Sequence, residues 1–77
     1  MATNIIINGI AKESEKAICL ICLVSYNANA PKERNIWMPK SVCKVVNEHV
    51  AEVADWFLAK TRDENAFHGY RMNFETL

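Results

Sequence analysis

The chain contains little of what long loops, disulfide frameworks or membrane spans require. Its 77 residues include two glycines, two prolines and three cysteines. So few turn-forming residues argue against long irregular loops. An odd number of cysteines in apolar context indicates reduced thiols that pack as small hydrophobic side chains, which is typical of a cytoplasmic protein. The longest apolar run, residues 17–24, is far shorter than the roughly 20 residues that cross a membrane.

The sequence also lacks a basic excess and a secretory leader. The first residues, Met1 to Asn4, have no positive charge and no long apolar stretch follows them, so no signal peptide is predicted. Net charge is zero, but residues 1–46 carry six basic and three acidic side chains, and residues 47–77 carry three basic and six acidic ones. A nucleic-acid-binding protein is usually basic. A dipolar chain better suits docking to a protein partner or self-association as a homodimer.

The length predicts one domain over residues 1–77. A hydrophobic fraction of 51% is enough for a small core and argues against disorder. The chain has little room for a core, a cofactor-sized cleft and a lid together. We therefore expect a protein that is not an enzyme and has no cofactor.

Local patterns predict three strands before residue 40. Residues 4–10 are apolar and β-branched, and the pair Asn8-Gly9 within them is either a tight turn or a bulge. Residues 17–26 are apolar on both alternating faces, as in a strand covered on both sides. Residues 27–33 read as a loop. Residues 35–38 read as a short strand that stops because Pro39 cannot donate a backbone hydrogen bond.

The segment after Ser41 fits two structures. Valines and other apolar residues between 42 and 58 repeat at helical spacing, which predicts one helix over 42–63 with Ser41 as its N-cap and His49 on its apolar face. Alternatively, the β propensity of residues 42–46 gives a strand, followed by a helix from about residue 50 to 63. Both interpretations make residues 52–62 helical. Residues 67–74 read as a last strand or a docked tail.

Cysteine and histidine give no persuasive catalytic or metal-binding pattern. Cys19 and Cys22 have the C-x-x-C spacing, but they lie in an extended run, where residues i and i+3 point to opposite faces. Cys43 and His49 could form a nucleophile–base pair, yet no orienting acid accompanies them. We therefore predict structural cysteines, no catalytic residues and no metal site.

Two tryptophans stand out as candidate partner-binding residues. Trp37 is flanked by basic residues, and Trp56 lies one position off the apolar stripe of the predicted helix. Each would either fill the core or mark an interface. The predicted partner-binding set is Arg34, Trp37, Lys40, Lys44 and Trp56. Basic groups interleaved with an aromatic also suit single-stranded nucleic acid, which is the alternative function.

Three segments resemble small phage and prophage proteins of unassigned function that share a Trp-x-Pro-Lys-Ser strand motif. The segments are residues 13–18, residues 36–42 with Trp37-Met38-Pro39-Lys40-Ser41, and residues 54–60 with Asp55-Trp56. Together they cover about a third of the chain. The resemblance implies a small sheet or partial barrel with one helix, favours the strand interpretation of residues 42–46, and transfers no catalytic residue. The aromatic tail after Gly69 departs from the pattern.

The predicted fold is therefore α+β: an antiparallel sheet of three to five strands, or a partial barrel, with one amphipathic helix packed on it. The predicted function is that of a non-enzymatic phage-type interaction protein. It would bind and inhibit or modulate a host protein or ribonucleoprotein complex, such as a CRISPR effector or another defence assembly. Free nucleic acid is the less expected partner, and no membrane association is expected.

Overall fold

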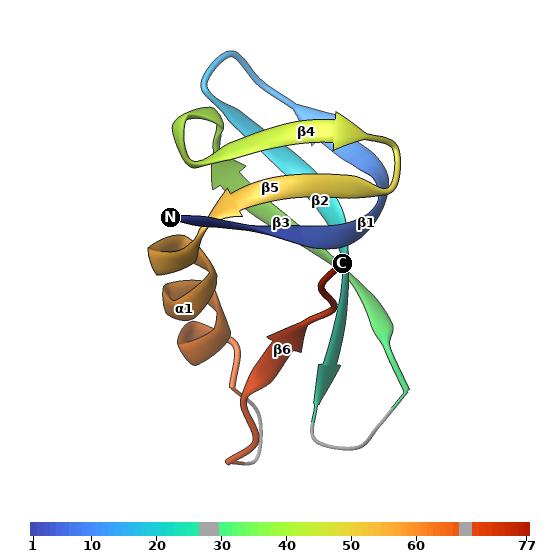
Figure 1. Cartoon of the computed structure of the whole chain (residues 1–77), viewed down its shortest axis with the longest axis vertical. Helices are drawn as coiled ribbons and strands as arrows, with labels where there is room; N and C mark the ends of the chain where they lie inside the picture. Colours follow the sequence, from blue (N-terminus) through green and yellow to red (C-terminus); the bar gives the residue numbers. More distant parts are fainter. Residues whose placement is uncertain (27–29, 67–68) are drawn as a thin grey trace.

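The computed structural model describes residues 1–26, 30–66 and 69–77. Its elements, in chain order, are β1 (Ala2–Glu13), β2 (Ala17–Tyr26), β3 (Lys32–Pro39), the 3-10 turn η1 (Lys40–Val42), β4 (Cys43–Asn47), β5 (Val50–Ala54), α1 (Asp55–Glu64) and β6 (Met72–Phe74). The sheet is antiparallel in the order β3-β2-β1-β5-β4, and β6 pairs with β2. One helix packs against this sheet (Figure 1). The predicted α+β class is confirmed, with a sixth strand added.

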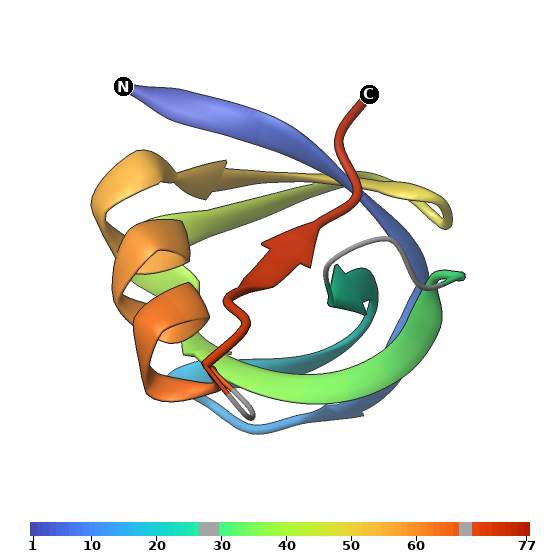
Figure 2. The ribbon, with the colours of Figure 1, turned by 90° about the horizontal axis from the view of Figure 1, so that it is seen from below.

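The long strand β1 joins the two parts of the sheet. Its first half pairs with β5 and its second half with β2, and the register with β2 shifts between Ile7 and Ile10 and again before Lys12. Gly9 lies at this point with φ +93°, a conformation that other residues rarely adopt. Of the two predictions for Asn8-Gly9, the bulge is therefore correct. The bulge lets the sheet curl, and Figure 2 shows the resulting cup.

The C-terminal segment fills the fork where β1 and β2 separate. β6 pairs with residues 24–26 of β2, and Glu75 then connects both strands: its N–H donates to the Leu23 carbonyl (2.9 Å), and its carbonyl accepts from the Ile6 N–H (2.8 Å). The Leu77 N–H donates to the Asn4 carbonyl at 3.1 Å. The strand predicted over residues 67–74 is thus present, but only over Met72–Phe74. Phe67 and His68 lie outside the described residues.

The core lies inside the curled sheet. Its fully buried large side chains come from β1, β2, β3, β5 and β6: Ile5, Ile7, Leu20, Cys22, Val24, Met38, Val53 and Met72. α1 contributes half-buried Phe57 and Leu58. Pro39 ends β3 as predicted, although the strand begins earlier, at Lys32.

The prediction that residues 52–62 are helical is wrong for its first three residues. Residues 43–47 and 50–54 form a β-hairpin, and α1 begins only at Asp55. Ser41 belongs to η1 and caps no helix. His49 is exposed in the turn between β4 and β5, where its N–H donates to the Asn47 side chain at 2.8 Å. Three factors favour the hairpin over the helix. The valines have high β propensity, the Asn47 side chain stabilises the turn, and β5 pairs with β1.

Candidate partner-binding surface

Both candidate tryptophans are exposed. Trp37, on β3, has 50% of its surface accessible, and Trp56, in the first turn of α1, has 60%. Trp37 alternates with inward-pointing Ile36 and Met38, so its position in the strand places it on the outer face. The helix turns Trp56 away from the core while the next residue, Phe57, packs toward it. Neither tryptophan therefore serves mainly to fill the core.

A groove separates β3 from α1, and we call it the tryptophan groove. It has a volume of about 470 Å³. Its lining residues are Asn35, Ile36 and Trp37 of β3, Phe57, Thr61 and Glu64 of α1, and Asn65 just after the helix. Trp56 joins this surface through Phe57, because their rings make an edge-on contact with centroids 5.7 Å apart. In Figure 2, α1 lies on the side where β3 approaches the β4–β5 hairpin.

Trp37 also borders a second hollow, which is lined by no residue of α1. This hollow has a volume of about 320 Å³ and is lined by Lys16, Ala17, Trp37, Met38 and Pro39. Its surface is mostly apolar, with one lysine at the margin. Trp37 therefore lines two depressions.

The predicted basic residues are not gathered around Trp37. The Arg34 guanidinium donates to the Tyr26 hydroxyl and to the Asn65 side-chain oxygen, each at 3.0 Å, so it ties β3 to the end of α1. The Lys40 ammonium forms an ion pair with Glu13 at 2.6 Å. Lys44 lies on β4, at the opposite end of the strand order, in register with Glu52 of β5. Arg34 and Lys40 are thus engaged by other side chains of the fold.

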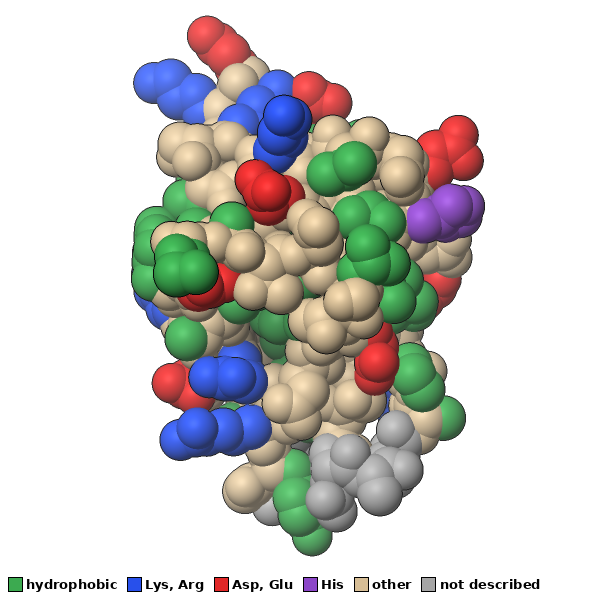
Figure 3. All heavy atoms as spheres, viewed as in Figure 1, with side chains coloured by type: hydrophobic (Ala, Val, Ile, Leu, Met, Phe, Trp, Pro, Cys, Tyr) green, Lys and Arg blue, Asp and Glu red, His purple; other side chains and the backbone are tan. Residues whose placement is uncertain are grey.

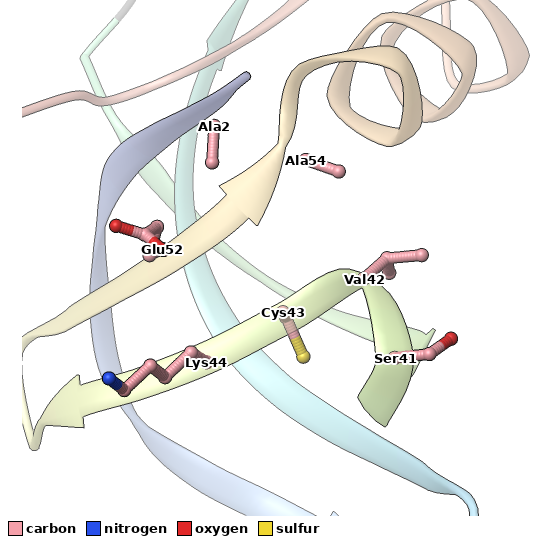
Figure 4. A pocket seen from close by; sticks show the side chains of 7 residues that line it. All are labelled: Ala2, Ser41, Val42, Cys43, Lys44, Glu52 and Ala54. Carbon is pink, nitrogen blue, oxygen red and sulfur yellow. The ribbon is translucent and has the colours of Figure 1, made fainter.

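Lys44 lines a different depression, between η1, β4 and β5 (Figure 4). It has a volume of about 250 Å³, with Ala2, Ser41, Val42, Cys43, Lys44, Glu52 and Ala54 around it. The Cys43 thiol points away from Lys44 and Glu52 in Figure 4 and donates to the Pro39 carbonyl at 3.6 Å. Burial raises the pKa of this thiol. A thiol with a raised pKa is a weaker nucleophile.

The other two cysteines are buried in the sheet. Burial, together with neighbouring Cys19 and Cys43, raises the pKa of the Cys22 thiol to about 12. A thiol that holds its proton so tightly is a poor nucleophile and metal ligand. Among residues 1–26, 30–66 and 69–77, no three His, Cys, Asp or Glu side chains are grouped closely enough to hold a metal ion.

Several groove residues were not predicted from the sequence. Asn35, Thr61 and Glu64 have no distinctive local pattern, and they meet only because α1 lies beside β3. The adjacent aromatic pair Trp56-Phe57 was the available signal, since one ring of such a pair on a helix faces the core and the other faces outward.

Charged and hydrophobic side chains share the face shown in Figure 3. The exposed large hydrophobic side chains of the described residues are Met1, Ile10, Trp37, Val46, Trp56, Tyr70 and Leu77. Of these, Trp37 lines the tryptophan groove, and Trp56 contacts Phe57, which also lines it. No helix in the described part of the chain is long and apolar enough to span a membrane.

No protein-family model, curated protein or solved structure matches this chain. The resemblance to small phage proteins therefore stays a prediction drawn from the residues.

Proposed function

We propose that this chain is a non-enzymatic binding protein that uses the tryptophan groove and its two exposed tryptophans to engage a protein or ribonucleoprotein partner. The observation that carries the proposal is that Trp37 of β3 and Phe57 of α1 line one groove, and that Phe57 also makes an edge-on ring contact with the exposed Trp56. Tryptophan is the residue type most enriched among energetically dominant interface positions. Exposed indoles are costly to leave in water, so a partner that covers them gains affinity.

Following the resemblance, we propose that the partner is a host macromolecular complex whose activity is inhibited or modulated by binding. The small size of the chain is compatible with such a role, because a single groove with two aromatic anchors can dominate the energy of a standard interface. The Arg34 guanidinium supports this role indirectly, because its hydrogen bond to the Asn65 side chain ties β3 to the end of α1 at the border of the groove.

The test is capture from host lysate with matched variants. The double variant Trp37→Thr, Trp56→Gln removes both indoles and keeps residues suited to a strand and a helix. The control, Val46→Thr, changes an exposed apolar residue on β4. We expect wild type and control to capture the same complex and the double variant to lose at least 90% of it. Because all three positions are exposed, thermal melts should agree within a few degrees. Equal capture by the double variant would move the interface elsewhere.

Single-stranded nucleic acid is the alternative ligand, because bases stack well on exposed indoles. Its binding would require several cations along the strand, whereas Lys40 and Arg34 are already engaged within the fold. Fluorescence anisotropy with a single-stranded oligothymidine at 50 and 200 mM salt distinguishes a nucleic-acid ligand from a protein partner. Tight, salt-sensitive binding that the Trp37 change abolishes would favour nucleic acid over a protein partner.

A further inference from the structure

The two edges of the sheet differ in how open they are to another strand. β4 has five residues, and its register with β5 shifts between Val45 and Asn47. A short, bulged edge is a poor template for pairing. β3 has eight residues, in unbroken register with β2 from Lys32 to Pro39. β3 is therefore the better template.

The register shows which backbone groups of β3 point outward. The Lys40 N–H donates to the Lys16 carbonyl, and Pro39 is paired with Ala17. In an antiparallel ladder this makes Pro39–Ala17 a non-hydrogen-bonded pair, and the two kinds of pair alternate along the strand. The even-numbered residues of β3 thus bond to β2, and Glu33, Asn35 and Trp37 direct their N–H and carbonyl groups away from it.

These outward groups lie where the tryptophan groove is. Asn35 and Trp37 line it, and within residues 1–26, 30–66 and 69–77 no backbone hydrogen bond outside the strand ladders uses Glu33, Asn35 or Trp37. These three residues span two strand repeats, or roughly 13 Å at about 3.3 Å per residue. The groove thus has a row of unpaired backbone groups as one wall and α1 as the other.

Building on the proposed function, we infer that the partner contributes an extended segment that adds to the outer edge of β3 as a further strand. Main-chain hydrogen bonds to Asn35 and Trp37 supply affinity, and alternate side chains supply specificity. On one face the segment meets Ile36 and Phe57, which calls for bulky apolar residues at every second position. At the far end, the exposed Glu64 carboxylate has no ion pair among the described residues, which suits a basic residue.

A partner segment fits this edge better than a second copy of the chain. α1 walls the groove, so a two-fold pairing of β3 with β3 would bring two helices to the same edge. A single extended segment meets no such obstruction.

The test uses a displayed library of random heptapeptides selected on the immobilised full chain. We expect enriched sequences with apolar residues at alternate positions and a basic residue near one end. Binding of a selected peptide should be at least tenfold weaker for Asn35→Pro, which removes one outward N–H, than for Asn35→Ala, which loses the same side chain but keeps that N–H. Proline is tolerated at an edge position whose N–H faces away from the ladder. No enriched sequence, or equal binding to both variants, would overturn the inference.

Amide hydrogen exchange of the wild-type chain tests the same point without a variant. Adding the selected peptide should slow exchange at Asn35 and Trp37 at least tenfold and leave Ile36, already bonded to β2, unchanged. Unaltered exchange at Asn35 and Trp37 would overturn the inference. It would also be overturned if these two amides were already protected in the peptide-free protein and light scattering showed a dimer. If lysate capture needs the tryptophans but survives Asn35→Pro, the proposed function stands and the added strand does not.

Discussion

Met72→Ala is the sharpest test of the docked C-terminal segment. Met72 is fully buried, is followed by five residues and pairs with Tyr26 of β2. The substitution removes three heavy atoms from the core and leaves a cavity, for which methionine-to-alanine changes cost about 2–5 kcal/mol. A chain of this size has a total stability of roughly 4–12 kcal/mol. A loss near 3 kcal/mol lowers Tm by roughly 12–24 °C.

The assay is a circular-dichroism melt with urea unfolding of the same variant. The matched control is Asn73→Ala, an exposed position on the same strand, which should melt within about 3 °C of wild type. The lysate partner or a selected peptide is left out, because ligand would raise Tm by mass action. If Met72→Ala melts as the control does, the C-terminal segment does not contribute to the core and its place between β1 and β2 is wrong.

Three further predictions concern stability. Burial raises the pKa of the Cys22 thiol to about 12 in the folded protein, whereas an unperturbed thiol titrates near 9.0. The stabilising contribution of the protonated thiol to folding is therefore complete below pH 9 and is lost as pH rises toward 12. The urea midpoint should fall more steeply above pH 9 for wild type than for Cys22→Ala, and parallel profiles would contradict this. Gly9→Val should cost about 1–2 kcal/mol in urea unfolding through the positive φ alone, since an added Cβ meets no atom within 4 Å, and Gly9→Asn should cost less. Phe57→Ala should cost about 2 kcal/mol in urea unfolding, below the value for a full burial, because the ring is only half-buried; an unchanged midpoint would place the helix elsewhere.

Local sequence determined the class of the fold and several of its parts. The apolar runs at residues 4–10 and 17–26 are strands, Pro39 ends β3, and the bulge at Gly9 was one of two expected structures. These features depend on backbone chemistry within a few residues: β-branching, a missing N–H and a missing Cβ. The same local information identified Trp37 and Trp56 as unusual residues.

Long-range pairing decided the rest. The helical spacing of the valines in residues 42–54 was a real pattern, but pairing with β1 gave a hairpin, because a strand buries Ala51 and Val53 while satisfying its backbone groups in the sheet. The tertiary structure also set the partners of the charges: Arg34 and Lys40 are engaged by residues 31 and 27 positions away. The groove exists only because α1 folds back beside β3, and no local pattern encodes that contact.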